Sequence, residues 1–226
     1  MLLPAAKAVV SAVVFTIAAC CGRNTLQTTN FINSKCDDCS ISNLLPESDY
    51  DNPKAMVQHL QSLKREDLLE IFRVSQAPKD LSQIEGEWNG YLLENNGVVM
   101  TAVSKVMTNG LFGKTRRWNG KAFSAGGRGI NRFLNKGNGS SDKEHSFDYT
   151  IEESKIHSGK PSVKLQYANY QSRFSLWKTM VDEVRVVPGN SNVLIGFGAM
   201  AWSGGMKNSA PFCLTQAHLS ESRFRQ

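Results

Sequence analysis

Three charged residues lie in the otherwise valine-rich stretch 181–187: Asp182, Glu183 and Arg185. Side chains alternate between the two faces of a strand, so Glu183 and Arg185 share one face and Asp182 lies on the other. If the Glu183 and Arg185 face points into a cavity, Arg185 needs a carboxylate partner and would bind the carboxylate of a ligand. If that face points outward, the two residues form a solvated pair of little energetic consequence.

Carboxylates could also transfer protons inside a cavity, as in barrel-shaped isomerases. The candidates for such acid/base work are Asp148, Glu152, Asp182 and Glu183. The sequence alone assigns none of them as catalytic, because that chemistry depends on geometry. It contains neither a G-x-S-x-G elbow nor an H-E-x-x-H helix.

The cysteines do not form a recognisable metal or redox centre. Cys36 and Cys39 make a CxxC pair in a polar leader, without the preceding strand of a thioredoxin-like site or the further ligands of a zinc site. A disulfide is the simpler interpretation in an exported chain. Cys213 lies in an apolar segment and is predicted to be buried. We therefore expect no metal and no cofactor.

Aromatic residues are spread over the alternating segments of the C-terminal two thirds. They are candidates for the wall of a cavity that holds a flat or acyl ligand, and the alternative is an ordinary filled core. The candidates are Trp118, Tyr149, Tyr167, Trp177 and Trp202.

The first 21 residues have the features of a targeting segment. An apolar stretch follows Lys7, and small residues precede Cys20, which would be lipidated in a bacterial lipoprotein. We expect an exported, secreted or organellar protein, with a plastid as one destination and a lipid anchor at Cys20 if the source is bacterial. No apolar run reaches the length of a spanning helix, which excludes a polytopic membrane protein.

The pattern of residues divides the rest of the chain into four parts. A polar linker is expected over 22–50, a helical arm over 51–78, a β-barrel over 79–214 and a flexible tail over 215–226. Strands are expected over 85–93, 121–123, 146–153, 162–167, 181–187, 193–202 and 210–214, and 98–107 fits either a strand or a short helix. Gly126, Gly127 and Gly129, together with Arg128, predict a flexible loop.

Several short motifs occur in a characteristic order over residues 80–214. Gly86-Glu87-Trp88-Asn89-Gly90 begins the first strand, Trp118-Asn119-Gly120-Lys121-Ala122-Phe123 follows, and Asp182-Glu183-Val184-Arg185 comes later. This order resembles the uncharacterised GXWXG-type proteins and, more loosely, calycin barrels such as lipocalins and nitrobindins. The resemblance implies an antiparallel calycin-like barrel in which Gly86, Trp88 and Gly90 close one end. It supplies no established activity.

A haem ligand is not apparent, because the histidines lie near turns or outside the barrel: His59, His145, His157 and His218. The net charge is +6, and a basic stretch over 116–136 includes Lys121 and Arg132. That stretch has no known nucleic-acid readout motif, so a solvated rim or attraction to anionic lipid headgroups is the better interpretation.

These observations favour lipocalin-like binding of a small apolar or amphipathic ligand, such as a lipid or pigment. Arg185 would be its polar anchor, beside Glu183 on the same face. Two alternatives stay open. One is an isomerase or lyase that uses cavity carboxylates, and the other is an accessory subunit that docks to a membrane complex through its basic loops.

Overall fold

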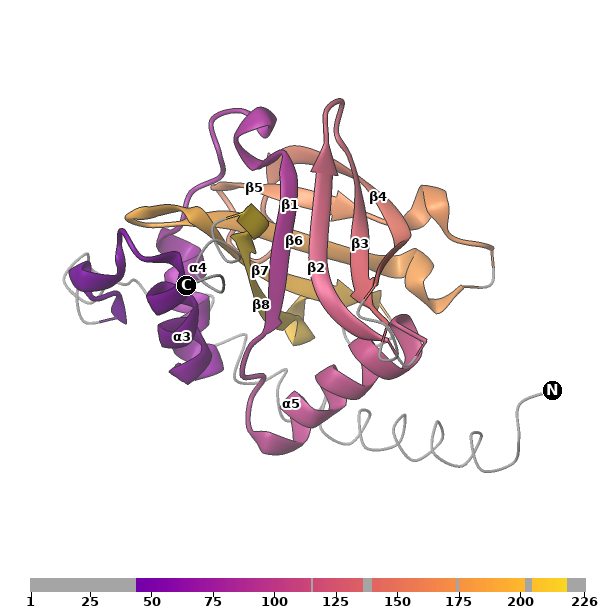
Figure 1. Ribbon diagram of the computed structural model, residues 1–226, viewed down its shortest axis with the longest axis horizontal. Helices are drawn as coiled ribbons and strands as arrows, with labels where there is room; N and C mark the ends of the chain where they lie inside the picture. Colours follow the sequence, from indigo (N-terminus) through magenta and orange to yellow (C-terminus); the bar gives the residue numbers. More distant parts are fainter. Residues whose placement is uncertain (1–43, 115, 136–139, 174, 202–204, 219–226) are drawn as a thin grey trace.

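The computed structural model describes residues 44–114, 116–135, 140–173, 175–201 and 205–218. Within these residues eight antiparallel strands form a closed barrel (Figure 1), where each strand pairs with the next and β8 pairs with β1. This confirms the predicted mainly β, calycin-like fold. The strands are β1 (Gly86–Leu92), β2 (Arg117–Ser124), β3 (Arg128–Leu134), β4 (Ser141–Glu153), β5 (Pro161–Gln166), β6 (Met180–Val187), β7 (Asn190–Met200) and β8 (Ala210–Gln216). The predicted targeting segment, Cys20, Cys36, Cys39 and Trp202 lie outside the described residues.

Strand β3 corrects the sequence interpretation. Gly126 and Gly127 do form a turn, with φ of 79° and 75°, but Arg128 and Gly129 already belong to the strand. Gly129 faces the interior, where a Cβ atom would lie 2.3 Å from the ring of Phe147. The sequence hides this strand because a glycine and a buried asparagine occupy inward positions where a strand pattern normally shows apolar residues.

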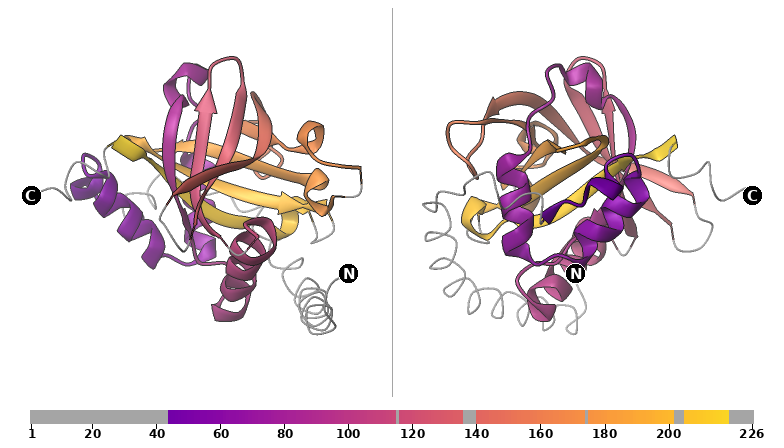
Figure 2. Two further views of the ribbon diagram at one scale, coloured as in Figure 1. Left: turned by 45° about the vertical axis from the view of Figure 1, so that its right-hand side comes forward. Right: turned by 90° about the vertical axis from the view of Figure 1, so that its left-hand side faces the viewer.

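Helices cover both ends of the barrel. At one end the 3-10 helix η3 (Leu81–Ile84) precedes β1, and the indole Nε1 of the fully buried Trp88 donates to the Ile84 carbonyl at 2.8 Å. At the other end the stretch around 98–107 is helical. It forms α5 (Val98–Lys105) and continues as a π-helix, η4 (Val106–Phe112), across that end (Figures 1 and 2). None of the helices among the described residues is both long and apolar enough to cross a lipid bilayer.

The helical arm consists of α3 (Pro53–Ser62) and α4 (Arg65–Val74), which lie beside the barrel (Figure 2). Asn52 caps α3, since its side-chain oxygen accepts from the Ala55 amide at 3.2 Å. The two helices pack on the outer faces of β6, β7 and β8 and bury a second core outside the barrel. Cys213 belongs to this outer core, and burial raises the pKa of its thiol well above the ordinary value. The outer faces of these strands are therefore buried from solvent, as their inner faces are.

The glycine Gly90 makes room for a tryptophan inside the barrel. A Cβ atom at this position would lie 2.5 Å from Cη2 of Trp118 and 2.7 Å from the Gly120 Cα. We expect Gly90→Ala to lower the free energy of unfolding by about 1–3 kcal/mol, because the indole and the neighbouring strand would have to shift. Urea unfolding followed by circular dichroism measures this loss.

The matched control is Gly110→Ala in η4, where the nearest atom would lie 3.8 Å from the new methyl group. That change should leave stability unchanged or raise it by up to about 1 kcal/mol, since alanine favours helices more than glycine does. Equal losses in the two variants would contradict the packing argument.

Candidate functional site

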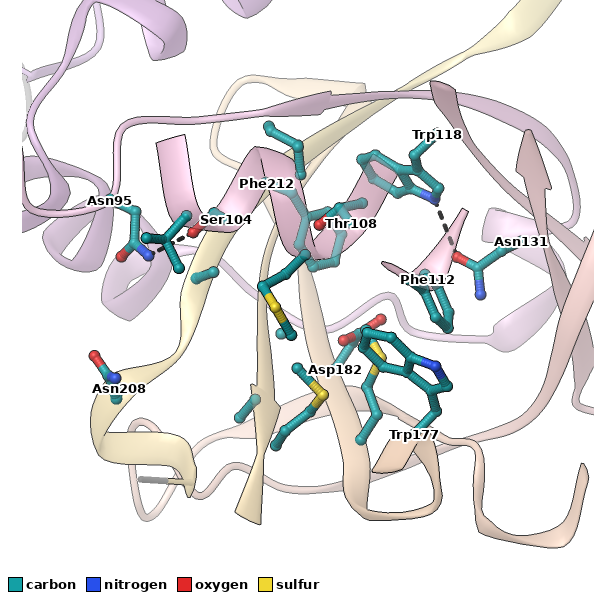
Figure 3. Close-up of a pocket in the computed structure, with 18 of the residues that line it drawn as sticks. Asn95, Ser104, Thr108, Phe112, Trp118, Asn131, Trp177, Asp182, Asn208 and Phe212 are labelled. Carbon is teal, nitrogen blue, oxygen red and sulfur yellow. Dashed lines mark hydrogen bonds between the residues drawn. The ribbon is translucent and has the colours of Figure 1, made fainter. Parts of the chain in front are cut away.

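A cavity of about 110 Å³ opens inside the barrel beneath α5 and η4 (Figure 3). Its walls come from β1, β2, β3, β6, β7 and β8, and its cover comes from the two helical segments. Most of the lining is apolar and adaptable, because methionine side chains are flexible and polarisable. The apolar lining residues include Met100, Met107, Phe112, Trp118, Trp177 and Phe212.

The cover is fixed to the barrel at its C-terminal end. Phe112 of η4 is buried and stacks on the imidazole of His145, with ring centroids 4.1 Å apart. His145 Nε2 also bonds the Phe112 carbonyl at 2.9 Å, and burial lowers the pKa of this histidine. The Asn109 side-chain oxygen accepts from the Trp118 amide at 2.8 Å. π-helical turns are rare and occur frequently at functional sites, so η4 makes this end of the barrel a candidate site.

A buried lysine forms the polar end of the cavity. Lys121 extends inward from β2 and is 2% exposed. Its Nζ donates to Asn131 Oδ1 at 2.9 Å, to the Tyr167 hydroxyl at 2.7 Å and to Asp182 Oδ2 at 2.8 Å. Burial lowers the pKa of Lys121, and the Asp182 carboxylate opposes that shift. With three acceptors in reach the amine is held as an ammonium ion, and four aromatic rings surround it: those of Trp118, Phe147, Tyr167 and Phe212.

Tyr167 and Asn131 complete this network. The Tyr167 hydroxyl donates to Asp182 Oδ2 at 2.7 Å, and the two N–H groups of the Asn131 amide donate to that hydroxyl and to the His145 carbonyl. The Trp118 indole donates to Asn131 Oδ1 at 3.1 Å. Burial, together with the Asp182 carboxylate, raises the pKa of Tyr167 well above its ordinary value, so its side chain stays a neutral phenol. We call Lys121, Asn131, Tyr167 and Asp182 the polar cluster.

One carboxylate oxygen of the polar cluster accepts no hydrogen bond from the described residues. Asp182 is 1% exposed, and its Oδ1 has no hydrogen-bond partner in the described part of the chain. Asp182 lines the cavity opposite Gly198 of β7, and a Cβ atom on that glycine would lie 2.7 Å from Oδ1. A buried carboxylate oxygen without a partner is costly and so points to a ligand or water.

The aromatic candidates among the described residues occupy three places. Trp118 and Trp177 line the cavity, and the Trp177 ring lies 4.6 Å from that of Phe112. Tyr167 belongs to the polar cluster behind them. Tyr149 is elsewhere in the core, with its hydroxyl bonded to the Ser124 carbonyl and its ring packed on Phe123.

The Glu183 and Arg185 face points away from the cavity, against the hypothesis of an inward ligand anchor. Neither residue is solvated, because the helical arm and the β4–β5 connection cover them and both are fully buried. Glu183 accepts from the Ser154 and Ser162 hydroxyls and from the Lys155 amide. Arg185 donates to backbone carbonyls of α4, of the β4–β5 connection and of Pro161 at the start of β5. Both side chains therefore hold the outer layer on the barrel.

Other candidates also lie outside the cavity. Asp148 accepts from the Tyr170 hydroxyl and the Asn169 amide, and Glu152 pairs with Lys164 at 2.8 Å. Asp182 is thus the one predicted acid/base carboxylate that lines the cavity. None of the described histidines lines it, and the described residues include no cluster of three His, Cys, Asp or Glu that could hold a metal ion.

The predicted basic stretch is not one surface. Lys121 is inside the barrel, and Arg132 pairs with Glu87 at 3.0 Å. Arg116 pairs with Asp142 at 2.9 Å and with Glu144. These contacts neutralise much of the positive charge that the sequence shows between 116 and 132.

The central pair Lys121–Asp182 was missed as a pair by sequence reasoning, although both residues were noted separately. The available signal was the position of Asp182 on a strand face that otherwise carries Val184 and Val186. An acid on such a face needs a buried cation or a ligand. No family model matches the chain, and comparisons with curated proteins and with solved structures also found no match.

Proposed function

We propose that this protein binds a small amphipathic molecule in the cavity beneath α5 and η4. The observation that carries the proposal is a largely apolar cavity whose charged groups all lie at one end, formed by Lys121, Asn131 and Asp182. Small-molecule sites commonly combine such walls with a few fixed polar groups that orient the ligand.

The size of the cavity limits the ligand. An apolar cavity of about 150 Å³ accommodates benzene. The volume here is about 110 Å³, which suits a compact molecule of a similar number of heavy atoms. A longer chain would require α5 to move, and Met100 is the buried residue of this helix, while Val98 and Val99 are 88% and 58% exposed.

Tryptophan fluorescence tests the proposal directly, because Trp118 and Trp177 line the cavity. We expect a saturable change in emission when a panel of six-carbon cyclic alcohols, amides and hydrocarbons is added to the full chain. Thr108→Phe, a change in the cover that fills the cavity, should weaken binding at least tenfold, or about 1.4 kcal/mol.

The matched control is Thr150→Phe, at an exposed position on β4, which should bind like the unchanged protein. The proposal fails if no member of the panel gives a saturable signal, or if Thr108→Phe binds as tightly as the control.

A second candidate function is catalysis of a proton transfer, which one observation favours. The Oδ1 atom of Asp182 belongs to a carboxylate that lines the cavity and has no partner among the described residues, as a general base requires. Turnover of a bound alcohol or ketone that is lost in Asp182→Asn, with ligand affinity retained, would favour this candidate over simple binding.

A further inference from the structure

We infer that the cavity selects a neutral ligand whose polar head donates a hydrogen bond, namely an alcohol or an N–H amide, and that it discriminates against carboxylates. This inference rests on the proposed function, since it defines the chemical class of the ligand of that site. It replaces the Arg185 carboxylate anchor that the sequence favoured.

Every N–H and O–H donor of the polar cluster already donates a hydrogen bond within the protein. The three N–H groups of Lys121 reach Asn131, Tyr167 and Asp182. The single O–H group of Tyr167 goes to Asp182, and both N–H groups of the Asn131 side chain are also bonded.

The Trp118 indole N–H completes this account, because it donates to Asn131. A ligand carboxylate at this end of the cavity would therefore find no donor without breaking an existing bond.

The polar cluster does offer a hydrogen-bond acceptor to a ligand. Asp182 lines the cavity, and its Oδ1 atom is buried and has no hydrogen-bond partner among the described residues. Gly198 places no side chain against this oxygen, whereas any larger residue would place a Cβ atom 2.7 Å from it. A hydroxyl or amide N–H of a ligand would satisfy Oδ1, and a hydrocarbon would leave it buried without a partner.

The charges of the polar cluster also favour a neutral ligand. The Lys121 ammonium and the Asp182 carboxylate lie 2.8 Å apart and neutralise each other. A ligand ammonium would add an uncompensated positive charge beside Lys121, and a ligand carboxylate would place a second negative charge against Oδ1. Each is costly in a buried site, so a neutral head is favoured.

The remaining polar groups do not reverse this preference. Asn95 and Ser104 lie on the side of the cavity away from Asn131 (Figure 3), and the Asn95 amide donates to the Ser104 hydroxyl at 2.8 Å. Both are neutral, as are the other polar lining residues Thr108 and Asn208, so these groups can accept or donate without selecting a charged ligand.

The experiment compares four compounds that each carry one group on a cyclohexane ring, by calorimetry on the full chain: cyclohexanol, methylcyclohexane, cyclohexylammonium and cyclohexanecarboxylate. We expect cyclohexanol to bind at least about tenfold more tightly than each of the other three, because sites built to bond a hydroxyl strongly reject analogues without it. Gly198→Ala should abolish the preference for the alcohol over methylcyclohexane, since the new methyl group would shield Oδ1.

Asp182→Asn provides a second variant, checked for folding by near-ultraviolet circular dichroism, and it should lose the discrimination against the carboxylate. The control is Ser162→Ala, which removes a buried hydrogen bond to Glu183 outside the barrel and should leave the order of affinities unchanged. If none of the four compounds binds, the proposed function itself fails. If methylcyclohexane or the carboxylate binds as tightly as cyclohexanol, the cavity is a binding site but the inferred ligand class is wrong.

Discussion

Replacing Lys121 by methionine is expected to lower the free energy of unfolding by about 3–5 kcal/mol. The change removes one partner of a fully buried ion pair and leaves the Asp182 carboxylate without its cation in a dry barrel. It also removes the donors to Asn131 Oδ1 and to the Tyr167 hydroxyl. Urea unfolding monitored by circular dichroism measures the loss.

The double variant Lys121→Met with Asp182→Leu distinguishes the removal of the whole ion pair from the removal of one of its charges. Replacing a buried ion pair by apolar residues of similar volume is often neutral or stabilising, so the double variant should recover most of the stability lost in the single one. Lys164→Met is the matched control, because its partner Glu152 is exposed and such pairs contribute about 0–1 kcal/mol. If the single variant were as stable as the control, or the double variant no more stable than the single one, the ion pair would not be the main cause of the lost stability.

Much of the barrel could be predicted from local patterns. Alternation of apolar and polar residues locates β4 and β5, and the turn residues of 158–161 and 188–192 separate the strands on either side of them. These signals depend only on neighbouring residues, so a single sequence contains them. Strand β3 was not predicted, because its inward Gly129 and Asn131 are not apolar and their role depends on the strands beside them.

The polar cluster could not be predicted in the same way. Lys121 and Asp182 are 61 positions apart and come from β2 and β6, which do not pair in the barrel order. They meet only because the closed barrel brings opposite walls together, and a residue pattern does not specify that distance. The alternation on β6 was predicted correctly, but which face points inward is decided by α3 and α4 on the outside.

Replacing Arg185 by methionine is the second change with a large expected effect, a loss of at least about 3 kcal/mol in the free energy of unfolding. The guanidinium donates to the carbonyls of Phe72, Lys160 and Pro161 at 3.0 Å each, and it lies 4.6 Å from the centroid of the Phe72 ring. Methionine removes all three bonds, of which the one to Phe72 is buried and the other two are part-buried, and an unsatisfied buried group costs about 1–3 kcal/mol. Arg117→Met, at an exposed position of β2, should change stability by no more than about 0.5 kcal/mol.

The same variant decides between two roles of Arg185. If Arg185 fastens α4 to the barrel, its loss should speed hydrogen exchange selectively in α4. The affinity for cyclohexanol should then stay within about threefold under conditions where the variant is folded. As a ligand anchor, its loss should weaken binding strongly with stability unchanged. The contacts of Arg185 with α4 and with the β4–β5 connection favour the first result, because they are all made on the side of β6 away from the cavity.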